Sequence, residues 1–165
     1  MVYRSEKKEG TVPLPLSEED SGLFRYYLAD TGMFVHQSRI PRSDFMVKDK
    51  RRTLSGTFYE KYVADELRAK EIALFYWTGK KSNGMEFAVQ NGPYAVPIDV
   101  KKNAGKKNSL DAFRTFNPKY TAVKISSGNY GYDPERDLLS IQLYQTFLLA
   151  EQLSKGESIT PRMRD

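Results

Sequence analysis

Gly84-Met-Glu-Phe-Ala-Val-Gln-Asn-Gly-Pro-Tyr-Ala-Val-Pro-Ile-Asp-Val-Lys-Lys102 has the pattern of a β-hairpin. Near its centre lies Asn91-Gly92, a pair that tolerates positive φ angles and is typical of two-residue hairpin turns. A turn at these two residues would oppose Gln90 with Pro93, Val89 with Tyr94 and Phe87 with Val96.

Alternation along the two arms separates apolar from charged side chains. One face carries Phe87, Val89, Tyr94, Val96, Ile98 and Val100. Three charged residues, Glu86, Asp99 and Lys101, coincide on the other face. Two carboxylates can hold Mg²⁺ or Mn²⁺ through hard oxygen ligands, and a nearby lysine can orient the attacking water in phosphodiester cleavage. The alternative is a strand that simply ends in charged residues as it leaves the core.

Length and composition exclude several classes of protein. The chain has 165 residues, enough for one domain with its own core. It has no cysteine, which excludes disulfides, and a single histidine, His36, which argues against a histidine-based triad. No apolar run approaches a membrane span and the start does not resemble a signal peptide, so we expect a cytoplasmic protein without a membrane partner. The net charge of +5 suits a polyanionic partner without requiring one.

Periodicity and turn residues divide the rest of the chain. We expect residues 1–22 to be a flexible lead or an edge strand, residues 23–153 to be one domain, and residues 154–165 to be a frayed tail. Within the domain the pattern predicts helices over 23–35, 55–70 and 109–116, strands over 72–77 and 121–126, a loop over 129–137, and a short strand followed by a helix over 138–153. The strands before and after the 109–116 helix should form a parallel crossover, which gives a mixed sheet with helices on both faces.

Two further groups of residues have both a functional and an ordinary interpretation. Glu60 is either a third carboxylate facing the metal or the last residue of a capping box that begins at Thr57. Lys102, Lys106 and Lys107 either contact a nucleic-acid backbone or keep a loop soluble.

Several segments together resemble a known family. They are Gly56 to Leu67, Leu74-Phe-Tyr-Trp77, Glu86-Phe-Ala-Val89 and Val96-Pro-Ile-Asp99-Val-Lys101, preceded by Phe24-Arg-Tyr-Tyr-Leu-Ala-Asp30-Thr-Gly32. Their order and spacing resemble the C-terminal domain of a prokaryotic AAA-type ATPase family, a PD-(D/E)XK, restriction-endonuclease-like domain. The resemblance covers roughly residues 23–150 and implies an α/β protein with a three-layer α/β/α fold and a mixed central sheet.

The resemblance also implies roles for individual residues. It gives metal binding to Glu86, Asp99 and Glu60, with help from the Val100 carbonyl, and catalysis to Lys101 together with the two hairpin acids. The family pattern has Asp where Glu86 stands and Glu where Asp99 stands, so each side chain differs in reach by one methylene. We therefore expect a Mg²⁺-dependent nuclease-like domain acting on DNA and normally attached to an ATPase module. The alternative is a non-catalytic module that docks protein or DNA; a homo-oligomer interface is a third interpretation.

Overall fold

The computed structural model describes residues 2–17, 22–39, 52–79, 84–101 and 108–161. Within these residues eight strands form one mixed sheet in the order β2-β1-β3-β4-β5-β6-β8-β7. The strands are β1 (Val2–Glu9), β2 (Phe24–Leu28), β3 (Leu74–Thr78), β4 (Gly84–Asn91), β5 (Tyr94–Val100), β6 (Ala122–Ser126), β7 (Gly131–Asp133) and β8 (Leu138–Gln142). No described helix is long and apolar enough to cross a membrane.

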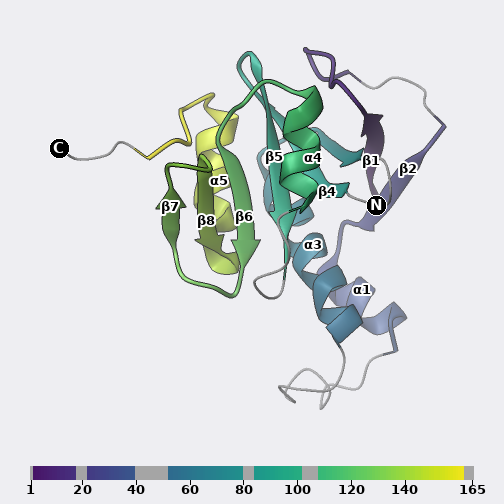
Figure 1. Cartoon of the computed structure of the whole chain (residues 1–165). Coiled ribbons are helices and arrows are strands. Elements are labelled where there is room, and N and C mark those ends of the chain that lie inside the picture. The colour runs from purple at the N-terminus through teal and green to yellow at the C-terminus, as the bar shows by residue number, and fades with distance from the viewer. Residues whose placement is uncertain (1, 18–21, 40–51, 80–83, 102–107, 162–165) are drawn as a thin grey trace.

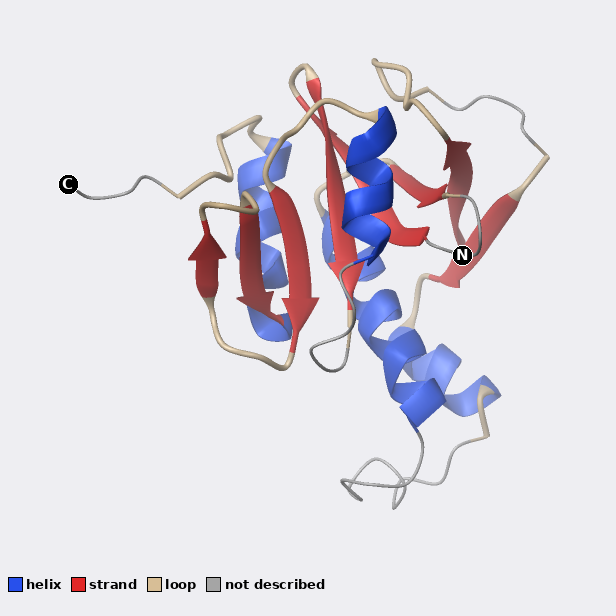
Figure 2. Cartoon of the chain, in the orientation of Figure 1, coloured by secondary structure: helices blue, strands red, loops and turns tan. Residues whose placement is uncertain are grey.

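Helices cover both faces of this sheet, as the sequence predicts (Figures 1 and 2). The described helices are α1 (Thr31–Gln37), α3 (Arg52–Ala69), α4 (Asn108–Phe116) and α5 (Thr146–Ser154), with a 3-10 turn η2 (Leu143–Gln145) before α5. Helices α3 and α5 share one hydrophobic cluster, whereas α4 packs into two others. The expected parallel crossover is confirmed, because β5 and β6 pair in parallel on either side of α4.

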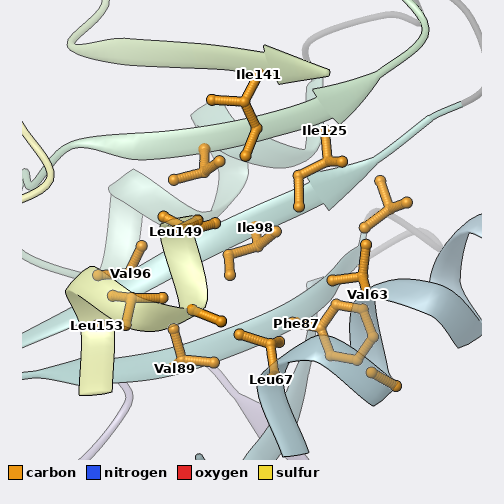
Figure 3. Close-up of a cluster of buried hydrophobic side chains, with 14 of the residues drawn as sticks. Val63, Leu67, Phe87, Val89, Val96, Ile98, Ile125, Ile141, Leu149 and Leu153 are labelled. Carbon is orange, nitrogen blue, oxygen red and sulfur yellow. The ribbon is translucent and has the colours of Figure 1, made fainter. Parts of the chain in front are cut away.

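The larger core lies between the sheet and the pair α3 and α5 (Figure 3). Apolar side chains alternate along β4 and β5 toward this face and meet the apolar stripes of the two helices. The contributing side chains include Val63, Leu67, Phe87, Val89, Val96, Ile98, Ile125, Ile141, Leu149 and Leu153. Each buried side chain of this size contributes about 1.5–3 kcal/mol, so this face fixes the position of the hairpin in the sheet.

The hairpin forms over the expected residues, but its register differs from the expectation by two residues. Asn91 pairs with Tyr94 and Phe87 pairs with Ile98, which moves the turn to Gly92-Pro93. Gly92 has φ of +57°, and the fixed negative φ of proline at the next position suits a type II′ turn, which needs only one positive φ. Because the slip is an even number of residues, the side chains from Phe87 to Val100 keep their expected faces.

The N-terminal third of the chain departs most from expectation. Val2–Glu9 is not a flexible lead, since β1 lies inside the sheet between β2 and β3. No strand forms over 11–16. The helix expected over 23–35 is wrong: β2 runs antiparallel to β1, and α1 follows after Asp30, whose side chain caps the helix through the Met33 amide.

Two smaller expectations at the C-terminal end also fail. Part of the loop expected over 129–137 forms the edge strand β7. The tail is not frayed throughout, because Ile159 is buried in the larger core and the Asn91 Nδ2 donates to the Glu157 carbonyl at 2.9 Å. These contacts attach the segment after α5 to the tip of the hairpin.

Candidate functional site

The hairpin brings Glu86 and Asp99 together at the end of the β4–β5 ladder. Phe87 and Ile98 form the last regular pair, and Glu86 and Asp99 come next on their strands. There the Glu86 carboxylate continues the contact between the strands, because its Oε2 accepts the Val100 amide at 3.0 Å. Val100 therefore contacts Glu86 through its amide, whereas the group expected to help bind a metal ion was its carbonyl.

A β-bulge explains why Glu86 points toward β5. On the other side of β4, Phe75 pairs with Ala88 and Trp77 with Met85, so two steps along β3 correspond to three along β4. The extra residue turns the local chain direction and redirects side chains, a feature that is common beside functional sites. Met85 and Ala88 consequently both join the cluster below α4, while Phe87 joins the larger core.

Lys101 links the two acids into one cluster, which we call the Glu86–Asp99–Lys101 cluster. Its Nζ lies 2.9 Å from Glu86 Oε1 and 2.9 Å from Asp99 Oδ1. The two acids are nearly enclosed, with side-chain exposures of 14% and 16%. The prediction that these three side chains lie close together is confirmed.

Burial dominates the electrostatics of the cluster. Burial is the largest of the causes that raise the pKa of Glu86 to about 7; the neighbouring Asp99 also raises this pKa, and Lys101 counters the shift. Burial also lowers the pKa of Lys101, but contacts with Asp99 and Glu86 more than offset this and raise the pKa above its ordinary value. The lysine therefore stays protonated while Glu86 titrates near neutral pH.

Glu60 lines a pocket between β2 and α3, and Glu86 forms part of the same pocket. This β2–α3 pocket has a volume of about 400 Å³, and its walls include Arg25, Tyr27, Phe34, Glu60, Lys61 and Glu86. Burial raises the pKa of Glu60, and Arg25 and Lys101 partly counter the shift. The prediction of a capping box is wrong, because Thr57 lies inside α3 and not at its start. Glu60 therefore does not cap the helix, and it lines the pocket.

The two carboxylates of the cluster suit a hard divalent cation such as Mg²⁺, which proteins often hold through one or two carboxylates. One cation, the Lys101 ammonium, already contacts both carboxylates, and the buried Asp99 Oδ1 has no hydrogen bond of regular geometry to any described residue. Glu60 does not complete a set of three acids, since no group of three or more His, Cys, Asp or Glu within the described residues is arranged to hold a metal. Lys102, Lys106 and Lys107 lie outside the described residues.

Sequence reasoning missed the residues that β2 contributes to the pocket. Arg25 and Tyr27 point toward α3 because they alternate with Phe24 and Tyr26 along a strand. The expected helix over 23–35 concealed this alternation. The aromatic run Phe24-Arg-Tyr-Tyr-Leu28, which is typical of strands, was the available signal.

The shifted pKa of Glu86 predicts a dependence of stability on pH. Between its ordinary pKa of 4.5 and about 7, the folded state binds more protons at Glu86 than the unfolded state does. The free energy of unfolding should therefore fall as pH rises through this range, by at most about 3 kcal/mol. Urea unfolding at several pH values in EDTA measures the fall, and Glu86→Gln should remove most of it. An unchanged slope in that variant would assign the dependence to other groups.

Comparisons of the chain with protein-family models, with curated proteins and with solved structures found no significant match.

Proposed function

We propose that this chain is a nuclease-like domain with a restriction-endonuclease-like α/β/α fold, which hydrolyses phosphodiester bonds of DNA with Mg²⁺ or Mn²⁺. One observation carries the proposal: Glu86 on one hairpin strand and Asp99 on the other both lie 2.9 Å from the ammonium nitrogen of Lys101. A solvated strand end would spread such charges into water, since burying them costs free energy unless they are paired.

Each residue of the cluster has a role in this proposal. Glu86 and Asp99 would hold the ion, whose chemistry when bound is to polarise the phosphate and to acidify a water molecule. Lys101 would release its contact with the acids, orient the attacking water and stabilise the negative charge that develops on the phosphate. The lysine is half-buried, so its charge acts in a medium less polar than water.

Isothermal titration with Mn²⁺ tests the metal site directly. The wild-type chain should bind Mn²⁺, and Asp99→Asn should weaken binding at least about tenfold, because a neutral amide replaces a charged ligand of the same shape. Asp111→Asn is the matched control, since Asp111 is exposed on α4 and should leave binding unchanged. Equal binding in wild type and Asp99→Asn, or binding in neither, would remove the metal site.

A second candidate, a non-catalytic docking module with the same fold, is favoured by the position of Lys101. Its ammonium already neutralises both acids, so the cluster is complete as a structural ion pair. Such a module would show neither Mn²⁺ binding nor cleavage, and Asp99→Asn would lower its stability by leaving the half-buried lysine with one charged partner fewer. The titration above, combined with thermal unfolding of the same two proteins, separates the candidates.

A further inference from the structure

The β2–α3 pocket adjoins the Glu86–Asp99–Lys101 cluster, because Glu86 belongs to both. Its volume of about 400 Å³ lies within the range of sites that bind small organic groups. Any group seated in the pocket would therefore lie next to the proposed point of cleavage. The proposed function gives the pocket no role, since Glu60 does not complete the metal site.

The pocket contains a buried polar atom whose hydrogen bonding is incomplete. Tyr27 is only 9% exposed, and its hydroxyl makes no hydrogen bond of regular geometry to any described residue, although the Arg25 guanidinium lies close to it. A buried hydroxyl with incomplete hydrogen bonding costs free energy, and a ligand that hydrogen-bonds to it would reduce the cost. This atom favours an occupant with hydrogen-bonding groups on its edge.

Aromatic side chains provide flat surfaces at the same pocket. Phe34 is half-buried and meets the Phe58 ring edge-on at 5.0 Å. Arg25 contributes a guanidinium group, which lies 4.2 Å from the Tyr76 ring centroid. Rings with an arginine nearby are the usual means by which proteins stack unpaired bases.

The charges of the pocket argue against a phosphate inside it. Glu60 and Glu86 both line it and would repel a phosphate, although Arg25 and Lys61 lie nearby. The Glu60 carboxylate can accept a hydrogen bond, and the Arg25 guanidinium can donate one. A neutral planar ring with donors and acceptors along its edge matches this lining best.

We propose that the β2–α3 pocket binds an unpaired nucleobase, so that the nuclease-like site acts on single-stranded nucleic acid or on an unpaired end. This rests on the proposed function for the cleavage step but not for the binding itself. A base within a duplex is stacked and paired, and it reaches a pocket between a helix and a sheet only after it leaves the stack. A base in the pocket would bring its adjoining phosphate toward Glu86.

Fluorescence anisotropy with a labelled oligonucleotide of about twelve nucleotides tests the proposal. Measured in EDTA at about 0.1 M salt, the wild-type chain should bind the single strand at least about tenfold more tightly than the duplex, as expected for a stacking contact that a duplex cannot make. Phe34→Ala and Tyr27→Phe should each weaken single-strand binding several-fold. Phe147→Ala and Tyr130→Phe are matched controls, since both side chains are exposed and lie on other elements.

The outcomes distinguish this inference from the proposed function. Equal affinity for the two strand forms, or equal losses in the pocket variants and the controls, would overturn it. Tyr27→Phe keeps the ring in the core, so it serves as the test should thermal unfolding show that Phe34→Ala is poorly folded. Asp99→Asn should keep the preference for single strands. Loss of that preference would show that the strand binds at the Glu86–Asp99–Lys101 cluster and not in the pocket. If the wild-type chain prefers single strands in EDTA and still does not cleave them with Mn²⁺, that result would contradict the proposed nuclease function and support the proposed base-binding pocket.

Discussion

Lys101→Ala is expected to lower Mn²⁺-dependent plasmid cleavage by at least about a hundredfold, the usual range for loss of one group that acts on the reacting atoms. The same variant should still bind Mn²⁺, and we expect it to bind more tightly. The reason is that the lysine ammonium lies 2.9 Å from both acids and competes with a metal ion for them. Loss of cleavage with retained binding separates Lys101 from Asp99, whose substitution should remove both.

Lys119→Ala is the control for this experiment, because Lys119 is exposed and carries the same charge change. Plasmid cleavage that persists in Lys101→Ala within tenfold of wild type would show that the lysine role is misassigned. Loss of Mn²⁺ binding together with cleavage would instead make Lys101 a structural partner of the acids. A thermal unfolding curve of each variant ensures that the comparison is made on folded protein.

The convergence of the cluster could be predicted because it depends on the period of a strand and not on its register. The turn expected at Asn91-Gly92 lies one residue further along, so every pair across the hairpin shifts by two. An even shift keeps the side chains from Phe87 to Val100 on their expected faces and leaves Glu86 nearer to Asp99 than expected. An odd shift would have separated the acids.

The register itself could not be predicted from nearby residues. Asn91 is a good turn former, yet in the structure its side chain is buried and bonds to Tyr120 and to the Glu157 carbonyl. These partners lie 29 and 66 residues away in the chain. Long-range contacts of this kind override a local turn preference.

The β1 strand escaped prediction for a similar reason. Its sequence, Val-Tyr-Arg-Ser-Glu-Lys-Lys-Glu, is as polar as a solvated lead, although it lies inside the sheet. Its buried charges find partners both within the strand and in the rest of the folded chain: Glu6 pairs with Arg4 of β1, and the Lys8 Nζ donates to the Ser17 carbonyl and lies 5.2 Å from the Phe75 ring centroid. Without β1 as a template, β2 could only be judged by its own spacing, which fits a helix as well as a strand.

The second large effect is on the stability of the larger core, which lies behind the cluster. Phe87→Ala should lower the free energy of unfolding by about 3–5 kcal/mol, because Phe87 is fully buried and the truncation leaves a cavity against Tyr27, whose ring centroid lies 5.7 Å away. A loss of this size is a large fraction of the total stability of an ordinary domain, about 5–15 kcal/mol. Urea unfolding followed by circular dichroism measures it.

Phe147→Ala is the matched control, since the same atoms are removed from a side chain that is 49% exposed, and its cost should be within about 1 kcal/mol. Phe87 directly follows Glu86 in the bulge of β4, so the cavity should also loosen the carboxylate that accepts the Val100 amide. Mn²⁺ affinity should therefore fall in Phe87→Ala under conditions where the variant is still folded, and remain unchanged in Phe147→Ala. Equal stabilities of the two variants would mean that the larger core does not hold the hairpin, and unchanged Mn²⁺ affinity in a folded Phe87→Ala would uncouple the cluster from that core.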